Sequence, residues 1–350
     1  MNGTLAPPKD SAFSKGNVLR TAALYCIAAA ALYWVFRDVN VRELKRDMLN
    51  ICWPLALLGM TVDVGRYVAQ SIRWRFLLKP VGTISFAKTF KALYAGIFLN
   101  LILPLRIGEA ARAYLASRFS GARFPTVVST IFVEYLIDGI WMAVGIGAVG
   151  LVVPLPANVL LAARVLGLAM LVAVALFVFF VVFRRSESFF TAGIPGRRFG
   201  PVRKVAAFLD TIRSGLRVVG RSGLLWASFG VSSFDFLFHI VAFWIIMIAY
   251  GITLPFDVAA AILLFVFVGL IIPITPSNVG TFQFLCKLGL MLFGVDATKA
   301  AGFSVVFFLI VLIPQAAIGC IAFVRSGERL WEIRNAIASL KLSAKEHPQP

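Results

Sequence analysis

The chain has 350 residues, of which 60% are hydrophobic and only 14% are charged. A soluble domain of this length would need more charge to cover its surface, so the composition excludes an ordinary soluble enzyme or binding module. The formal net charge is +18, yet the basic residues lie in short segments between apolar runs, as is typical of loops that face anionic lipid. We therefore predict an integral membrane protein and expect no nucleic-acid partner.

Continuous apolar runs predict an all-α, polytopic helical bundle. A spanning helix needs ~20 apolar residues, whereas membrane-spanning strands are shorter and alternate with period two. Six runs fit spanning helices: Val18–Phe36, Ile51–Ala69, Thr126–Val153, Leu160–Phe183, Leu224–Tyr250 and Gly302–Val324. The first run has the basic flank of a signal sequence, but it continues through Phe36, which favours an uncleaved span. We expect a multi-pass protein of the cell (inner) membrane.

The chain is expected to form a single integral membrane domain over residues 1–350. Its first half covers residues 18–183, its second half residues 223–325, and a polar cytoplasmic tail residues 326–350. Between the halves, residues 184–222 are rich in arginine, and apolar residues recur there at helical spacing. This pattern predicts an amphipathic basic helix on the inner leaflet. A shorter helix of mixed charge is expected at Arg37–Asn50.

The segment Phe86–Arg118 does not have the pattern of an ordinary span. Its apolar core, Ala92–Pro104, is about thirteen residues long, and a crossing takes ~20. The segments on either side, Arg66–Lys91 and Arg106–Arg123, are both strongly basic, so both should face the cytoplasm. A re-entrant hairpin that enters and leaves on the same side satisfies this requirement.

A second segment, Val258–Val295, is interrupted in its middle. Pro273 and Pro276 remove backbone donors and Gly280 frees the backbone, so a straight helix cannot continue. Non-helical backbone at membrane depth is tolerated only where protein or a polar cavity satisfies it. Each half thus carries one broken segment, which points to a transporter built from inverted repeats. Two unrelated loop turns are the alternative.

The densest polar group in the sequence lies at the first break. A helix is expected to resume from Gly108, and a helix start favours an anion. Arg106 adds a planar fork suited to phosphate, and Glu109 can orient either Arg106 or Arg112. These residues predict a site for an anionic headgroup. The alternative is an inner-surface anchor made of snorkelling arginines.

Glu134 and Asp138 lie four residues apart, so they share one face of an otherwise apolar span. Two bare carboxylates in a low dielectric cannot both stay ionised without partners. Arg106 and Arg112 are the predicted partners. Either the carboxylates act directly on substrate or protons, or they form a salt bridge that stabilises the bundle.

Other polar residues interrupt the apolar spans. Asp63 and Arg66 are spaced as an internal ion pair. Asp235 and His239 could relay protons, or the histidine could simply bond to a nearby carboxylate. The second span is expected to end at a membrane interface marked by Gln70, Arg73, Trp74 and Arg75.

Motifs of soluble chemistry are missing. We find no Walker loop, zinc-protease motif, paired cysteines or dinucleotide fingerprint, so we expect no metal, no cofactor and no catalytic residue. The cysteines show neither metal nor disulfide spacing and are expected to pack as small apolar residues: Cys26, Cys52, Cys286 and Cys320.

Three sequence elements resemble a known family. Phe98–Glu109 with Arg112 is similar to the N-x-x-x-P-x-R-x-G-E element of the lysylphosphatidylglycerol synthase transmembrane region family. Ser129–Asp138 resembles its E-R-x-x-D helix, and Pro273–Gln283 resembles its P-x-x-P-G-x-x-G-x-x-E element. Members of that family include the flippase half of bacterial aminoacyl-phosphatidylglycerol synthases. Together with the span pattern, the resemblance covers nearly the whole chain and implies lipid translocation.

The sequence departs from the family pattern at three positions. Tyr135 stands where the family usually has Arg, Ser277 where it has Gly, and Gln283 where it has Glu. The sequence therefore lacks the arginine beside Glu134 and the carboxylate at the second break that the family pattern has. The 350 residues contain no aminoacyl-transferase domain, so the synthase reaction is not expected.

We therefore expect a lipid translocase that moves an anionic or glycosylated lipid between leaflets. The alternatives are an integral-membrane transferase acting on a lipid-linked sugar or phospholipid, and a non-transporting partner subunit of a lipid-modifying enzyme. Homo-oligomers are also possible. The residues expected to bind substrate are Asn100, Arg106, Glu109, Arg112, Glu134, Asp138, Asn278 and Gln283.

Overall fold

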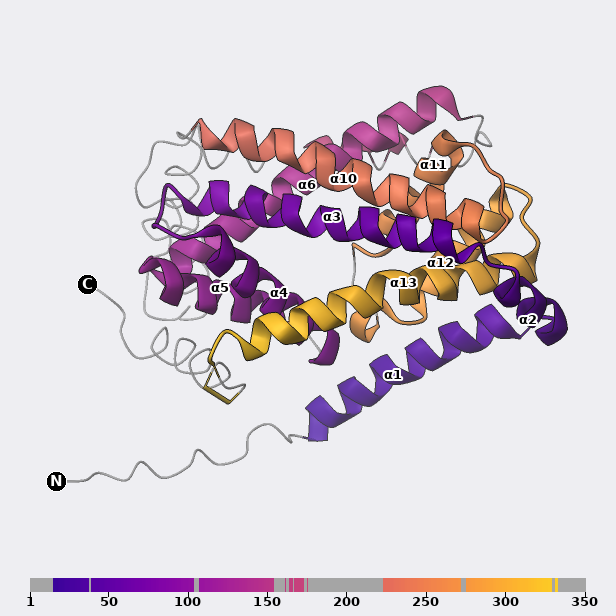
Figure 1. The fold of residues 1–350 in the computed structure, drawn as a ribbon, viewed down its shortest axis with the longest axis horizontal. Coiled ribbons are helices and arrows are strands. Elements are labelled where there is room, and N and C mark those ends of the chain that lie inside the picture. The colour runs from indigo at the N-terminus through magenta and orange to yellow at the C-terminus, as the bar shows by residue number, and fades with distance from the viewer. Residues whose placement is uncertain are drawn as a thin grey trace, which may run out of the picture.

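The structure, a computed structural model, describes residues 15–37, 39–103, 107–153, 223–271, 275–328 and 331–332, with a few residues between 161 and 175. Every regular element in this described part is a helix, which confirms the all-α prediction (Figure 1). The helices are α1 Lys15–Phe36, α2 Val41–Leu49, α3 Trp53–Leu78, α4 Phe86–Ile102, α5 Ile107–Ser120, α6 Phe124–Val152, α10 Leu224–Ala249, α11 Phe256–Gly269, the 3₁₀ turn η3 Pro276–Asn278, α12 Thr281–Leu292 and α13 Ala297–Val324. Most of the predicted span Leu160–Phe183, the amphipathic helix at 184–222 and most of the tail lie outside the described residues.

Helices α6, α10 and α13 are each long and apolar enough to cross a membrane. Helix α3 has 26 residues, but charged residues interrupt its apolar surface. It counts as a fourth crossing when it is joined to α2, which it meets at 80°. Helix α2 has no buried residue, as expected for a short surface helix. The chain is a multi-pass integral membrane protein.

The bundle has two ends, which the loops define. One end, here called the basic end, holds residues 79–85, 118–124 and 325–328. The opposite end holds residues 39–52, 249–256 and 293–299, where the N–H of Cys52 donates to the carbonyl of Ala249 at 2.9 Å. Helices α3 and α10 lie side by side and run in opposite directions between the two ends (Figure 1).

Two hairpins enter the bundle from opposite ends. The hairpin α4–α5 starts and finishes at the basic end, which confirms the predicted re-entry (Figure 1). The hairpin α11–η3–α12 starts and finishes at the opposite end. Each hairpin lies between two long helices in the chain, α3 and α6 in one half and α10 and α13 in the other. The two halves run in opposite senses, which is the arrangement of an inverted repeat.

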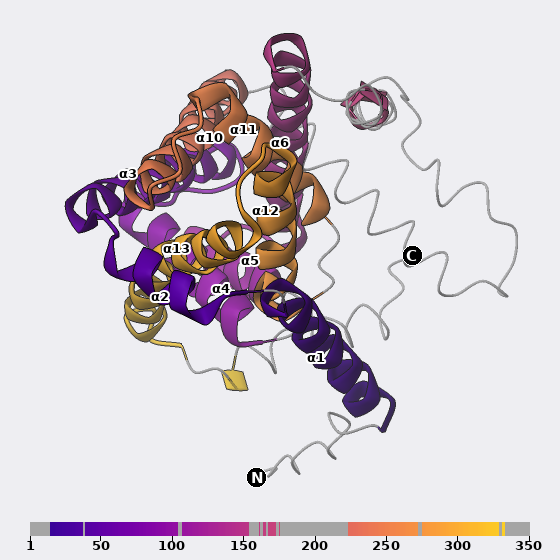
Figure 2. The ribbon, with the colours of Figure 1, turned by 90° about the vertical axis from the view of Figure 1, so that its right-hand side faces the viewer.

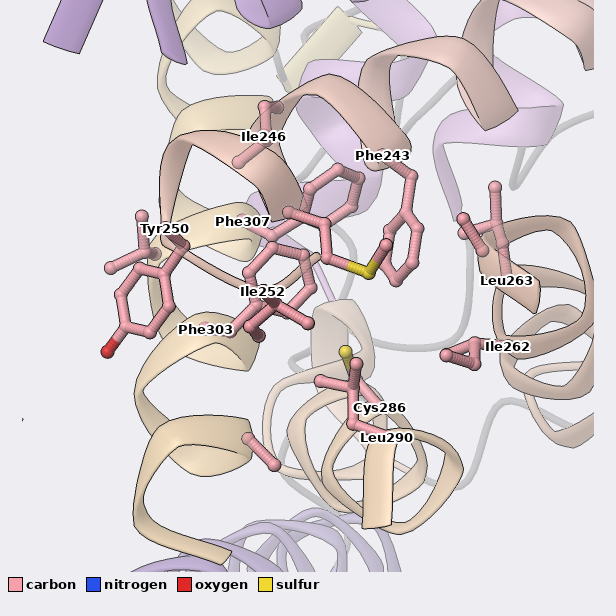
Figure 3. Packing of buried hydrophobic residues seen from close by; sticks show 14 of the residues in the cluster. Phe243, Ile246, Tyr250, Ile252, Ile262, Leu263, Cys286, Leu290, Phe303 and Phe307 are labelled. Carbon is pink, nitrogen blue, oxygen red and sulfur yellow. The ribbon is translucent and has the colours of Figure 1, made fainter. Parts of the chain in front are cut away.

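Two hydrophobic clusters form the core, and each is centred on one hairpin. The first surrounds Trp74 and Tyr94 on α3 and α4. In the second, Phe243 of α10 packs edge-on against Phe303 and Phe307 of α13, with ring centroids 5.2 and 4.9 Å apart (Figure 3). Helix α1 leans against one flank of the bundle, where it contacts α12 and η3 (Figure 2).

Candidate functional site

A stripe of polar residues runs along one face of α3. Asp63, Arg66, Gln70 and Arg73 follow one another at helical spacing, so their side chains lie above one another. The exposed fraction is 1% for Asp63 and 2% for Arg73. The stripe therefore points into the bundle and brings charge into its interior.

Arg73 connects three helices. Its Nη2 donates to Oε1 of Glu134 at 3.3 Å, and its Nη1 pairs with Asp138 one turn further along α6. The same Nη1 lies 3.7 Å from Asp235 on α10. The prediction that this region ends the span at a membrane interface is wrong. Arg73 is buried, and the neighbouring Trp74 is fully buried, because α3 continues past both residues to Leu78.

Arg112 extends the ion pairs to the first hairpin. Its Nη2 lies 2.9 Å from Oε2 of Glu134, and its Nε lies 2.8 Å from Oε2 of Glu109. The face of the guanidinium covers the ring of Trp74, 5.0 Å from the ring centroid. Arg112 is thus a partner of Glu134, as the sequence predicts. The direct partner of Asp138 is Arg73, which the sequence analysis had assigned to the interface.

Close packing holds α4 against α5 beside these charges. A Cβ at Gly108 would lie 1.9 Å from the carbonyl oxygen of Gly96, so only glycine fits at this crossing. One turn along α4, Asn100 donates its Nδ2 to Oε1 of Glu109 at 3.3 Å. The hairpin thus fixes Glu109 toward Arg112, at the edge of the buried charges.

A second cluster lies between α3 and α10. Oδ1 of Asp63 accepts from Nε of Arg66 at 3.2 Å, which confirms the predicted internal ion pair. The same oxygen lies 2.7 Å from Nδ1 of His239. Arg66 also reaches Oδ1 of Asp235 at 3.9 Å. The histidine is therefore bonded to a carboxylate on the neighbouring helix, while Asp235 on its own helix faces arginine.

Together the two clusters form one chain of charged groups. It contains five carboxylates, three arginines and one histidine: Asp63, Glu109, Glu134, Asp138, Asp235, Arg66, Arg73, Arg112 and His239. Charges in a membrane interior are costly unless they are paired, and they mark functional sites. The chain of charges links α3, α5, α6 and α10. It joins both halves of the repeat.

The two broken hairpins meet beside an apolar groove. Oγ of Ser277, in the second break, donates to the carbonyl of Leu101 at the end of α4, at 2.8 Å. The groove has a volume of about 400 Å³ and is lined by residues of α1 and of both breaks: Tyr25, Ala28, Ala29, Leu32, Leu101, Ile102, Leu103, Ser277 and Val279. This volume is within the range of small-molecule sites, about 300–1,000 Å³.

Unwound backbone forms the far wall of the groove. Ser277 and Asn278 have φ values of 52° and 58°, and Gly280 has 84°. These values fall in the left-handed region, which favours glycine. A Cβ at Gly280 would lie 2.6 Å from the carbonyl oxygen of Ala28, so α1 packs directly on this turn.

The predicted substrate residues divide into three groups. The structure brings five together around Arg112 and Arg73: Asn100, Glu109, Arg112, Glu134 and Asp138. Asn278 and Gln283 lie at the second break. The Oε1 of Gln283 accepts the N–H of Gly280 at 2.7 Å and so caps α12. Arg106 lies outside the described residues.

Two buried cations were missed by the sequence analysis. The helical spacing of Asp63, Arg66, Gln70 and Arg73 is the signal that could have placed Arg73 in the interior. Lys287 is 2% exposed, and its Nζ donates to the carbonyl of Val35 at 2.8 Å. It is the sole charged residue of α12, and a single charge in an otherwise uncharged helix is the signal that could have predicted its buried partner. Lys287 secures the end of α1, where a cation complements the helix dipole.

Comparison with known proteins agrees with this architecture. A family model described as lysylphosphatidylglycerol synthase TM region matches residues 20–319. A UPF0104 membrane protein of Methanocaldococcus jannaschii is similar to part of the chain, with 24% identity over 127 residues. That match covers 35% of this chain and 38% of the relative's own length, so the two are aligned over less than half of each protein.

Proposed function

Because the chain belongs to the lysylphosphatidylglycerol synthase transmembrane region family, we propose that it is a lipid translocase. It moves a lipid with an anionic or sugar-bearing headgroup between the leaflets of the cytoplasmic (inner) membrane and leaves the lipid chemically unchanged. One observation carries the proposal: two hairpins from opposite ends of the bundle meet at the Ser277–Leu101 contact, beside an apolar groove.

The groove suits a lipid tail. Its walls are mostly apolar and include Ala28, Ala29 and Leu32 of α1. Both breaks border it, so polar backbone lies next to apolar side chains. This combination matches an amphiphile, whose tail needs an apolar surface while its headgroup needs hydrogen bonds. The site lies at the interface of two inverted halves, where transporters bind their substrates.

The chain of charges supports passage of a polar headgroup. The side chain of Glu109 is 29% exposed and that of Asp138 is 40% exposed, whereas Glu134 between them is 1% exposed. Both outer carboxylates belong to elements inside the bundle. A partly exposed carboxylate at that depth needs water or a polar ligand. Arg106 keeps its predicted role as a phosphate contact.

Charge sets the orientation. Lys79, Arg118, Arg123 and Arg325 lie at or near the basic end, so this end faces the cytoplasm by the positive-inside rule. Basic residues at the opposite end, such as Lys45 and Arg46, alternate with Glu43 and Asp47. The hairpin α4–α5 therefore opens from the cytoplasm and α11–α12 from the other side.

Liposomes test the proposal. The purified full chain is reconstituted with tail-labelled phosphatidylglycerol, and an impermeant quencher reports which leaflet holds the label. Label is expected to cross faster than in empty vesicles and to remain chemically unchanged on chromatography. A new lipid product would instead indicate a transferase, and crossing no faster than in empty vesicles would contradict the proposal.

Arg112→Ala and Arg118→Ala form a matched pair on α5. Arg112→Ala takes the guanidinium away from Glu109 and Glu134, and every ~1.4 kcal/mol that this adds to the transport barrier is tenfold in rate. Arg112→Ala is therefore expected to slow transport by about tenfold or more. Arg118 pairs with Glu328 on the surface, and its loss is expected to leave transport unchanged.

Glu109→Gln keeps the test valid if the alanine variant misfolds, because it keeps the shape of the side chain and removes only its charge. It is expected to slow transport while the protein elutes and melts as the wild type does. Normal transport in both Arg112→Ala and Glu109→Gln would remove the chain of charges from the mechanism.

A further inference from the structure

Four charged or titratable residues between α3 and α10 are here called the tetrad: Asp63, Arg66, Asp235 and His239. When the histidine is neutral, the tetrad has one negative charge more than it has positive charges. Two carboxylates then face one guanidinium, and the formal charge is −1. A protonated His239 makes the tetrad neutral. Its members are joined by the contacts at 2.7, 3.2 and 3.9 Å described above. The tetrad therefore balances its charge only when it holds one proton.

In the part of the chain that the structure describes, neighbouring groups do not supply the missing charge. Arg73 lies 3.7 Å from Asp235, but it already faces Glu134 and Asp138 on α6. The titratable groups nearest Arg66 are otherwise Tyr67 and Tyr94, whose hydroxyls donate to the carbonyl of Val311 and to Oε1 of Gln70. Around the His239 ring, α11 and α13 present Phe267 and Phe307, which carry no charge.

The tetrad also contains carboxylate oxygens that have no hydrogen-bond partner among the described residues. Oδ2 of Asp63 is fully buried, makes no hydrogen bond, and belongs to a residue that is 1% exposed. Oδ1 of Asp235 is likewise buried, and its guanidinium neighbour at 3.9 Å is beyond hydrogen-bond distance. A buried ionised oxygen without a donor is unfavourable. A proton bound within the tetrad would lower the cost of burying these two carboxylates.

We propose that the tetrad is a proton-binding site that couples lipid movement to the proton gradient across the membrane. The proposal rests on the translocase function proposed above and names its energy source. When the tetrad is sealed from water, it holds one proton. When the two halves separate and water enters, the solvated carboxylates no longer require that proton, and it leaves.

The position of the tetrad links this proton to the hairpins. It lies between α3 and α10, which are the equivalent long helices of the two halves. The His239 ring stacks on Phe267 of α11, with centroids 5.2 Å apart. Protonated imidazole is attracted to an aromatic face, so the proton strengthens the contact between α10 and the helix that leads into the second break. Loss of the proton loosens it.

Two variants and a control test the coupling in the same liposomes. With one proton carried per lipid, a gradient of one pH unit is expected to drive the labelled phosphatidylglycerol of wild type to about a tenfold difference between leaflets. His239→Gln and Asp235→Asn are expected to lose this asymmetry. Ser233→Ala, whose hydroxyl bonds to the carbonyl of Gly230 on its own helix, is expected to keep it. Lipid that crosses in wild type without responding to the gradient would contradict the coupling and leave the translocase intact.

A second measurement depends neither on transport nor on the folding of the His239 and Asp235 variants. The chain has two histidines, so His347→Gln leaves His239 alone for nitrogen NMR of labelled imidazole. Its ring is expected to switch between protonated and neutral forms when the pH is changed. A ring that keeps one form throughout overturns the proposal. If even the wild type moves no lipid, the translocase fails, and this titration still decides whether the tetrad binds a proton.

Discussion

Lys287 and Lys299 both donate their ammonium group to a backbone carbonyl, but they differ in burial. Lys287 bonds to Val35 from the interior, with its charge 5.2 Å from the ring of Trp34. Lys299 bonds to Gly251 at 2.7 Å from an exposed position. A hydrogen bond made by a charged group contributes more where water cannot replace it. The two lysines thus separate the effect of burial from that of the bond.

Lys287→Met is expected to destabilise the protein in detergent by about 1.5–3 kcal/mol, because it removes a buried, charged donor. Lys299→Met is expected to cost less than about 1 kcal/mol, as exposed charges do. Thermal unfolding followed by circular dichroism checks both. Equal losses in the two variants would show that the buried lysine has no special role at the end of α1.

Some contacts of single residues could be predicted from the sequence, and others could not. The pairs Asp63–Arg66 and Arg112–Glu134 were predictable, because charges within an apolar span must find partners. The bond from His239 to Asp63 was not, since it depends on which helices lie side by side. Arg73 was misplaced because Gln70, Trp74 and Arg75 surround it in the sequence, a pattern that resembles the end of a span. Only the fold shows that Trp74 beside it is buried.

At the scale of elements, the hairpin α4–α5 depends on two glycines that face each other. The hairpin was predictable because its apolar core is too short to cross and basic segments flank it. Its tight packing was not, since contact between Gly96 and Gly108 requires the two helices to be placed in space. The interruption at Pro273–Gly280 was equally visible in the sequence. The contact of this interruption with Leu101 of the other hairpin could not be predicted from the sequence.

Gly108→Ala is expected to destabilise the protein by about 3 kcal/mol, at the upper end for overpacked sites, because the new methyl would collide with backbone of α4. Gly65 on α3 has open space around it. Gly65→Ala is therefore expected to leave stability unchanged or raise it by up to ~1 kcal/mol. Melting temperatures of the two variants measure the difference. If the Gly108→Ala protein has the same melting temperature as the wild type, α4 and α5 are not in close contact.

At the scale of the whole molecule, the two ends differ in charge, and the positive-inside rule predicts the topology from this difference. Lys45 on α2 and Arg123 before α6 are both exposed and lie at opposite ends. The fold as a bundle of inverted halves was predictable from the paired interruptions. The chain of charges that joins those halves could not be read from spacing, because its members come from four helices.

Single cysteines at these positions report orientation in intact cells, in a background without the natural cysteines. Lys45→Cys is expected to react with an impermeant maleimide added from outside. Arg123→Cys is expected to react only after the membrane is opened, because the positive-inside rule places it in the cytoplasm. Labelling in the reverse order would invert the direction assigned to both hairpins.

The pairing of α3 with α10 has a consequence for biosynthesis. The chain is made from its N-terminus, so Arg66 and Arg73 are already in the membrane when the ribosome delivers Asp235. An acidic helix that arrived first would have no counter-charge in the lipid. The earlier half thus provides a docking place for the later one. Expressed alone, residues 223–350 are expected to be degraded faster than the full chain, which a pulse-chase experiment measures.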